Sequence, residues 1–387
     1  MKTEPHSPDR RIKTRPPLLL PLIATAITFV SHISLSCSEE PVWETPNPER
    51  EFHFPSDHGN HPSFQFERWE IRCHLFSDHR RFALKATFVR LGQRPQETPN
   101  EEPFGDAHLF LAYLSLTDPV GEVFHHQQRL NRAGWNAFSL TGDLDIRNGD
   151  WRLVRSGSSL RLRGSIQSDA EIELRLHPHK RHVFLGEMST LHDTTETALP
   201  RYHIALSKLD VEGTLQLGDD SLSVIGKASL DHEISNRVYD ESSDDRDRAY
   251  LMLLNDHEII VDIARTTSGE NSGSSLIWID PAGSVTVQKN GEFRWTQMGD
   301  WKSPRTKAGY SVTPRLETTD PTSGIERAFL IQPIAPDQEI PKGFRSAAQW
   351  EGACDVLDKE TGEVVGWAFL ETSRFTGNTS SGNTEGM

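Results

Sequence analysis

The chain has 387 residues, a length that predicts two domains at about 150 residues each. Its 41 Lys and Arg face 56 Asp and Glu, and the net charge of −15 disfavours nucleic acids and anionic membrane surfaces as partners, because both repel an acidic protein. Only 35% of the residues are hydrophobic, while 27 Gly and 23 Pro are spread along the chain, a composition typical of many short strands joined by turns.

Residues 1–37 indicate an export signal. Basic residues between positions 10 and 15 precede the uncharged apolar run 18–30, which is shorter than the about 20 residues that span a bilayer. The run is followed by Ile33-Ser34-Leu35-Ser36-Cys37, which resembles a bacterial lipobox with Leu shifted one position toward Cys37. The segment predicts an exported protein of the periplasm or cell envelope, either attached to the membrane through a lipidated Cys37 or cleaved nearby.

Strand patterns dominate from residue 64 onward. Apolar residues recur with period two, as in half-buried β-strands, in the segments 67–75, 82–88, 160–162, 172–176 and 365–369. The segment 108–116 is apolar on both faces, as in a central strand, and 250–264 has the pattern of a β-hairpin. These patterns predict an all-β chain of two consecutive barrel or sandwich domains over 50–228 and 229–371, followed by a disordered tail over 372–387.

The remaining cysteines and the absence of common motifs exclude several classes. Cys73 and Cys354 both fall inside predicted strands, so two buried free thiols are favoured over a disulfide. The chain has no GxSxG, GxxxxGK[ST] or GxGxxG motif, and His232-Glu233 and His257-Glu258 lack the second His of a zinc protease motif. The sequence predicts no cofactor, and a secreted hydrolase is disfavoured because no nucleophile–base pair is visible.

The stretch FPSDHGNHPSFQFERW, Phe54 to Trp69, concentrates residues that carry chemistry. Asp57, His58 and His61 offer nitrogen and oxygen donors for a metal. In a segment rich in Pro and Gly, however, such residues more often cap turns or bond to the backbone. We therefore expect a rigid loop that leads into a strand, and no metal site.

Glu67 lies at the start of that strand. By alternation it shares a face with Trp69, Ile71, Cys73 and Leu75, so a face that lines a barrel interior places this carboxylate in apolar surroundings. Desolvation raises the pKa of a carboxyl group, which makes Glu67 a candidate proton donor. The alternative is a structural role, with Glu67 paired to an Arg or bonded by backbone amides.

A second acidic group lies in the stretch SLDHEI, residues 229–234. In an extended segment Asp231 and Glu233 project to one face and His232 to the other. These residues can supply an acid and an orienting partner, or they form a polar edge strand between the two domains. The strand-like pair Trp350-Glu351 suits either a core or a ligand pocket.

These motifs resemble, in the same order, those of the AttH-like and carotenoid 1,2-hydratase proteins. Phe54 to Trp69 is similar to the family's FPxDHGxHPxFxxEWWY, residues 229–235 to its WMDHEWS, and residues 337–352 to its DQE…YWEG. Together with matches in PRYHIALSKL, WKSP and GWAFLE, the resemblance spans residues 54–371. It implies two consecutive lipocalin-like β-barrel domains.

The resemblance also implies a hydratase that binds an apolar small molecule or lipid. In such a mechanism a neutral carboxylic acid, Asp231 or Glu67, protonates a C=C bond, and His232 orients the acid or activates water. The residues expected to contact the ligand are Trp69, Trp350, Glu351, Asp57, His58 and Tyr113.

Departures from the family motifs favour a rival function. The family's EWWY is Glu67-Arg68-Trp69-Glu70 in this chain, and both Trp of WMDHEW are replaced, by Ser229 and Ile234. Aromatic rings that would stabilise a carbocation are thereby fewer. The alternative to a hydratase is a lipid carrier or cell-envelope binding module that does not turn its ligand over.

Overall fold

The computed structural model describes residues 42–93, 108–134, 136–185, 201–236, 245–265, 274–344 and 348–372. Within these ranges the regular structure consists of strands and one three-residue 3₁₀ helix, η1 (Ser56–His58). None of the helical structure described is long and apolar enough to cross a membrane. The predicted export signal with Cys37 lies outside the described residues, as does the predicted tail beyond Thr372.

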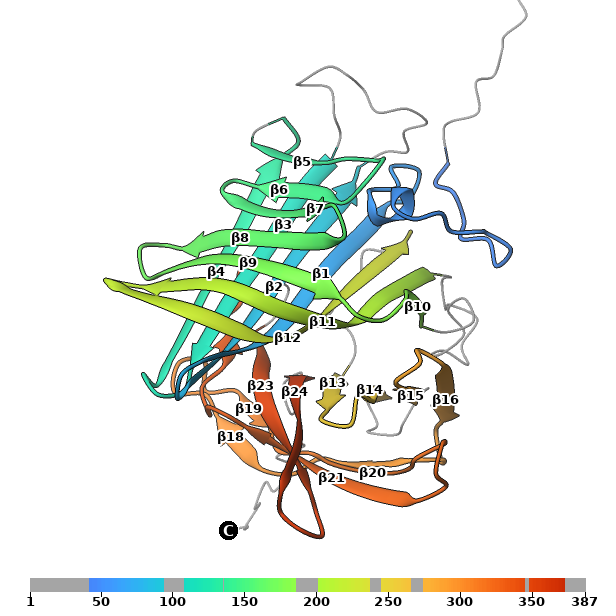
Figure 1. The fold of residues 1–387 in the computed structure, drawn as a ribbon, viewed down its shortest axis with the longest axis vertical. Coiled ribbons are helices and arrows are strands. Elements are labelled where there is room, and N and C mark those ends of the chain that lie inside the picture. Colours follow the sequence, from blue (N-terminus) through green and yellow to red (C-terminus); the bar gives the residue numbers. More distant parts are fainter. Residues whose placement is uncertain are drawn as a thin grey trace, which may run out of the picture. The chain divides into compact units, whose positions relative to one another are not determined.

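The first sheet has twelve antiparallel strands, in the order β4-β3-β2-β1-β12-β11-β9-β8-β7-β6-β5, with β10 paired to β11 (Figure 1). Its strands are β1 (Phe66–Ser77), β2 (Arg80–Gly92), β3 (His108–Asp118), β4 (Val123–Arg132), β5 (Ala137–Ser139), β6 (Asp145–Asn148), β7 (Trp151–Ser156), β8 (Ser159–Ile166), β9 (Ala170–Pro178), β10 (Val183–Phe184), β11 (Arg201–Leu217) and β12 (Asp220–Ser235).

The second sheet has ten antiparallel strands, in the order β16-β15-β14-β13-β24-β23-β21-β20-β17, with β22 paired to β23. Its strands are β13 (Asp245–Leu253), β14 (Glu258–Arg265), β15 (Ser275–Ile279), β16 (Val285–Lys289), β17 (Arg294–Thr296), β20 (Arg315–Thr319), β21 (Glu326–Pro333), β22 (Glu339–Ile340), β23 (Gln349–Asp358) and β24 (Val364–Thr372). Strands β18 (Asp300–Lys302) and β19 (Gly309–Ser311) form a separate pair. Both large sheets are barrel-like, and the predicted all-β fold of two lipocalin-like domains is confirmed.

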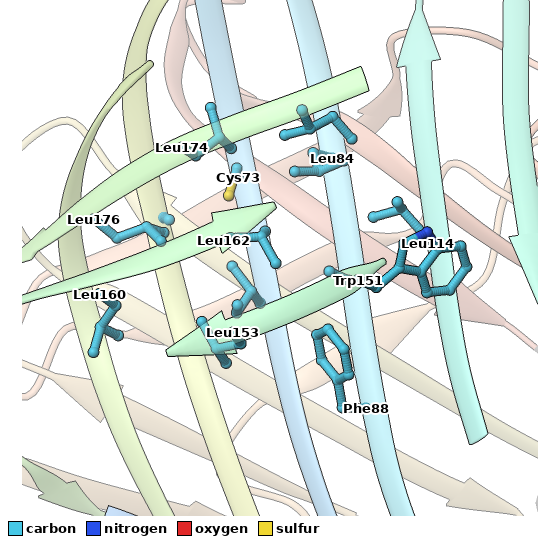
Figure 2. Packing of buried hydrophobic residues seen from close by; sticks show 14 of the residues in the cluster. Cys73, Leu84, Phe88, Leu114, Trp151, Leu153, Leu160, Leu162, Leu174 and Leu176 are labelled. Carbon is cyan, nitrogen blue, oxygen red and sulfur yellow. The ribbon is translucent and has the colours of Figure 1, made fainter. Parts of the chain in front are cut away.

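The core of the first sheet follows the predicted alternation. Trp69, Ile71, Cys73 and Leu75 of β1 are at most 1% exposed and pack into one apolar cluster with the inward residues of the neighbouring strands. Figure 2 shows part of this cluster, in which leucines from β7, β8 and β9 surround Cys73. Cys354 belongs to the core of the second sheet, so the two cysteines are buried and free, as expected.

Strand β1 is buried on its other face as well. Glu70, Arg72 and His74 alternate with the apolar residues, yet each is no more than 2% exposed. Part of the second sheet covers this face, as the ion pairs and ring contacts from Arg72 and His74 to residues of β13 and β24 indicate. The charged side chains of β1 therefore have no access to water and must find partners within the protein.

The junction between the sheets differs from the expected boundary. Strand β12 continues to Ser235 and pairs with β1 along its whole end, so residues 229–235 belong to the first sheet. The boundary expected between 228 and 229 falls inside β12. The polar residues of this segment predicted a link between domains. They are polar because one face of β12, like one face of β1, points away from the apolar core of the first sheet.

A substitution at Gly226 tests this tight pairing. A Cβ atom at Gly226 in β12 would lie 2.0 Å from the backbone oxygen of His74, which cannot move without shifting β1. We expect Gly226→Ala to lower the free energy of unfolding by roughly 1–3 kcal/mol in urea denaturation, because overpacking forces the backbone apart. Gly142→Ala, where a Cβ would meet nothing within 4 Å, is the control. Equal losses in both variants would contradict the packing of β12 against β1.

Candidate functional site

The strand register divides the predicted catalytic residues between two faces. In the β1–β12 pair Trp69 lies opposite His232, and Glu70 lies opposite Asp231. Residues directly opposite each other in an antiparallel pair share a face. Glu67 and His232 therefore meet on the face of the first core, while Asp231 lies on the face toward the second sheet, as the alternation of Asp231 and His232 predicts.

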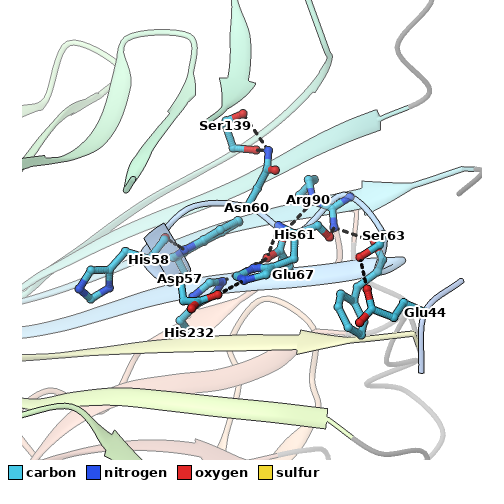
Figure 3. A network of polar contacts seen from close by, with 12 residues as sticks. Glu44, Asp57, His58, Asn60, His61, Ser63, Glu67, Arg90, Ser139 and His232 are labelled. Carbon is cyan, nitrogen blue, oxygen red and sulfur yellow. Dashed lines mark hydrogen bonds and ion pairs between the residues drawn. The ribbon is translucent and has the colours of Figure 1, made fainter. Parts of the chain in front are cut away.

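On the face of the first core, five side chains form what we call the inner cluster: Asp57, His61, Glu67, Arg90 and His232 (Figure 3). The His61 ring bridges two carboxylates, with Nδ1 2.8 Å from Glu67 Oε1 and Nε2 2.9 Å from Asp57 Oδ1. The His61 backbone amide donates to both oxygens of Glu67, at 2.9 and 3.0 Å, and Arg90 Nε donates to Glu67 Oε2 at 2.7 Å.

Glu67 is an anion in this setting. Burial raises its pKa, but the Arg90 guanidinium, the His232 ring 3.4 Å away and the hydrogen bonds from His61 outweigh burial and hold the pKa well below its usual range. This setting does not favour a neutral proton donor, because strand pairing places Arg90 of β2 directly opposite Glu67. The contacts of Glu67 match the structural alternative, because it pairs with Arg90 and accepts hydrogen bonds from a backbone amide.

His232 lies at the inner edge of the cluster, stacked on Trp69 with ring centroids 4.5 Å apart. It is 4% exposed, and burial lowers the pKa of its imidazole. Trp69 is itself a core residue whose indole donates to the backbone oxygen of His58 at 3.2 Å. The ring of His58 contacts His182, with the Nε2 atoms 2.9 Å apart, and burial lowers the pKa of His58 to about 3. These contacts tie the loop to the first sheet.

The inner cluster contains imidazole nitrogen and carboxylate oxygen atoms, which are common metal ligands. One atom each of His61, Glu67 and His232 lie within 4.8 Å of one another. A divalent cation would, however, compete with the Arg90 guanidinium for Glu67 and would have to displace the hydrogen bond between His61 and Glu67. The charges already present thus disfavour a metal, and hydrogen bonds to Glu67 account for the positions of His61 and Arg90, while His232 lies 3.4 Å from Glu67.

On the opposite face of β1, ion pairs connect the two sheets. Arg72 donates to Asp231 at 2.6 Å, pairs with Glu70, and lies 3.3 Å from the ring centroid of Tyr250 in β13. Burial raises the pKa of Asp231, but Arg72 and His203 lower it further than burial raises it. These cations favour an ionised Asp231, so the setting of Asp231, like that of Glu67, does not favour a neutral acid.

The remaining predicted ligand contacts do not converge with these acids. Glu351 in β23 accepts from Lys85 of β2 at 2.6 Å and so bridges the sheets. Trp350 is fully buried in the core of the second sheet, and its indole donates to the backbone oxygen of Pro336. Tyr113 lies on the face of β3 opposite to the core residue Ala112. Glu67 and Asp231 lie on opposite faces of the β1–β12 pair, and Trp350 lies in the core of the second sheet.

A pocket lies instead between the two sheets. It contains about 360 Å³ of empty space, part of it open to solvent. The first sheet and the segment after β10 contribute Leu185, Arg201, His203 and Glu233, and the second sheet contributes Arg248, Tyr250, Ile260, Asp262, Ser275 and Ile277. We call this cavity the inter-sheet pocket.

His203 is the group in the inter-sheet pocket best placed for acid–base chemistry. Its Nε2 lies 3.8 Å from Oδ1 of the ionised Asp231 and is buried with no hydrogen-bond partner among the residues that the structure describes. Glu233, directly opposite His203 in the strand register, pairs with Arg68 at 2.9 Å and with Arg201 at 3.4 Å. The sequence analysis did not single out His203, although the alternation of Arg201 and His203 with buried Tyr202 and Ile204 marks a polar face.

Comparison with known proteins relates this architecture to a family. A family model described as AttH-like matches residues 45–374. The chain belongs to the AttH-like family. No curated protein matches it.

Two solved structures share the AttH-like fold. A putative AttH from Nitrosomonas europaea is 23% identical, with a TM-score of 0.73 over 85% of this chain and 99% of that one. Kievitone hydratase from Nectria haematococca is 13% identical, with a TM-score of 0.62 over 87% of this chain and 97% of that one. At these identities the likeness establishes the fold of the AttH-like chain and leaves the reaction open.

Removing the Arg90 charge tests the inner cluster. Arg90→Met leaves Glu67 buried at 0% exposure without its guanidinium partner, and we expect a loss of about 3–5 kcal/mol in the free energy of unfolding. Arg161→Met breaks an exposed pair with Glu173 and should cost less than about 1 kcal/mol. Urea denaturation of both variants measures the difference, and similar losses would show that Arg90 does not stabilise a buried anion.

The pH dependence of stability tests the inter-sheet ion pairs. Burial raises the pKa of Glu233, but Arg201 and Arg68 bring it down to about 2. A carboxylate with a lowered pKa stabilises the folded state above its unfolded value of about 4.3, and this contribution is lost as the pH falls from there toward 2. We expect the free energy of unfolding of Glu233→Gln to fall less than that of the wild type between about pH 5 and about pH 3.

Glu173→Gln carries the same chemical change at an exposed position and serves as the matched control for this titration. Urea denaturation at each pH gives the two profiles. A Glu233→Gln variant that loses stability as steeply as the wild type over this range would contradict the ion pairing of Glu233.

Proposed function

We propose that this AttH-like protein binds a small molecule in the inter-sheet pocket and adds water to a C=C bond of that molecule, or removes it, with His203 as the acid–base group. The observation that carries the proposal is the pair of His203 and ionised Asp231, 3.8 Å apart, with His203 lining the pocket. The fold similarity to kievitone hydratase supports the reaction class.

The chemistry follows from this pair. The imidazolium of His203 gives a proton to one carbon of the double bond, and water bonds to the other carbon. One C–H and one C–O bond form, the π bond is lost, and the proton released by the water returns to His203. Asp231 stabilises the imidazolium and orients the ring, since it is an anion fixed by Arg72. A positioned acid–base group of this kind contributes about 10²–10⁴-fold to the rate.

The size and lining of the pocket narrow the ligand class. The free space inside the pocket is about 20 Å³, room for roughly one water molecule, so a small molecule would also have to occupy the open part of the pocket or displace side chains of its wall. Leu185, Ile260 and Ile277 offer apolar contact, while arginines and carboxylates form the rest of the wall. This lining suits a compact molecule that has both an apolar part and a polar group, more than the purely apolar molecule or lipid expected from the sequence.

A carrier that does not turn over its ligand is the second candidate. The acids that the sequence suggested as catalysts, Glu67 and Asp231, each accept from an arginine, and Glu351 accepts from Lys85. Acids held in this way are structural in many proteins. In a carrier the pocket would bind the same class of molecule, and His203 would only contribute a polar contact.

Turnover in labelled water distinguishes the two candidates. Citronellol and citronellic acid, which share a terminal trisubstituted C=C bond, are incubated with the protein in H₂¹⁸O, and mass spectrometry detects products that have gained one labelled water. We expect His203→Gln to lower kcat/KM by about 100-fold or more. His177→Gln, at a half-exposed histidine of β9 away from the pocket lining, is the control.

Native mass spectrometry of the same mixtures reports binding. A probe that binds without forming labelled product supports the carrier. Turnover that survives His203→Gln would show that another group supplies the proton. If neither probe binds nor reacts, the inter-sheet pocket is not a site for this class of molecule.

A further inference from the structure

Two histidine side chains meet outside the inner cluster, where the loop 54–61 contacts the segment before β10. The Nε2 atoms of His58 in η1 and of His182 lie 2.9 Å apart. The centroids of the two rings are 4.7 Å apart, and the ring planes are inclined by 50°. Figure 3 shows the His58 ring pointing away from the inner cluster, so this pair of histidines is a separate feature of the loop.

The distance between the two nitrogens matches that of two ligands on one metal ion. With metal–nitrogen bonds of about 2.0–2.1 Å, two ligands at right angles are about 2.9 Å apart, and two ligands at the tetrahedral angle are about 3.3 Å apart. Right angles between neighbouring ligands are typical of the square-planar and tetragonal sites of Cu²⁺ and Ni²⁺. The separation of 2.9 Å therefore fits Cu²⁺ or Ni²⁺ better than a tetrahedral Zn²⁺.

The surroundings hold both rings in place. His182 is stacked on Phe54, with ring centroids 3.5 Å apart and planes 1° apart. The backbone of His58 is fixed by two hydrogen bonds, since its oxygen accepts from the Trp69 indole and its amide donates to the backbone oxygen of Pro55. His58 is 9% exposed, whereas His182 is partly exposed and leaves the pair open to solvent. Ligands that are already oriented lose little conformational freedom on binding.

The charges around the two rings also permit a cation. Burial lowers the pKa of both histidines, so the rings are neutral, which is the form that binds metals. In the part of the chain that the structure describes, neither ring is bonded to a guanidinium, whereas Glu67 of the inner cluster is bound to Arg90. Asp143 and Arg155 act on His58 with opposite sign and pair with each other.

We infer that His58 and His182 bind one divalent transition-metal ion of the Cu²⁺ or Ni²⁺ class through their Nε2 atoms, with water at the remaining positions. The ion replaces the hydrogen bond between the rings, and the proton that one Nε2 carried moves to Nδ1 of the same ring. Because the two ligands come from different segments, the ion links the loop 54–61 to the segment before β10. The inference is independent of the proposed function, which uses the inter-sheet pocket.

Isothermal titration calorimetry with Ni²⁺ at neutral pH tests the site in the full chain. We expect His182→Gln and His58→Gln each to lower the Ni²⁺ affinity at least about 10-fold, since loss of a hydrogen-bond partner of a metal ligand already costs that much. His179→Gln removes an exposed histidine three positions before His182, and this matched control should keep the wild-type affinity. Equal affinities in the wild type and His182→Gln would overturn the inference and leave only a hydrogen bond between the rings.

Chemical modification of the wild-type protein keeps the inference testable if a variant does not fold. Diethyl pyrocarbonate acylates accessible imidazole nitrogens, and peptide mass mapping follows each histidine separately. We expect Ni²⁺ to slow the acylation of His182 and to leave that of His179 unchanged. Acylation of His182 at the same rate with and without Ni²⁺ would contradict the inference. Neither measurement uses an organic ligand, so their outcome is separate from that of the hydration assay.

Discussion

The burial of β1 on both faces is the constraint on which the rest of the structure depends. One face packs into the apolar core of the first sheet, and the other meets residues of the second sheet. Glu67, Glu70 and Arg72 on this strand are thus removed from water, and an unpaired buried charge costs several kcal/mol. Glu67 is bound to Arg90, and Glu70 and Asp231 to Arg72, because the strand register brings these opposite charges together.

The pairing of Glu67 with Arg90 and of Asp231 with Arg72 determines the protonation state that each carboxyl group favours. Burial alone would favour protonated carboxylic acids, but the adjacent guanidinium groups keep Glu67 and Asp231 ionised. The hydration that we propose therefore uses a different residue, His203, which lies beside Asp231 and borders the inter-sheet pocket.

The contact between the sheets combines apolar and ionic parts. Small apolar clusters join them, one containing Val183 and Ala205 with Ile277, and another containing Ala83 with Phe369. Ion pairs of Arg72 and Lys85 with carboxylates, and the inter-sheet pocket, also lie between the sheets. The AttH-like fold shared with kievitone hydratase at 13% identity supplies the two sheets, while side chains on the facing strands line the pocket.

The all-β class, several of the strands and the faces of the residues in them follow from the sequence alone. Alternation is a local property of an extended backbone, so the common face of Glu67 and Trp69 and the opposite faces of Asp231 and His232 could be predicted from their spacing. The same patterns placed both cysteines inside strands. The partner of each buried charged side chain, by contrast, depends on the tertiary structure. Arg90, Arg72 and Lys85 reach their carboxylates through the pairing of distant strands and the contact between sheets, and a pKa depends on these distances. The end of β12 and the inter-sheet pocket could not be predicted from the sequence for the same reason, because both depend on which strands become neighbours.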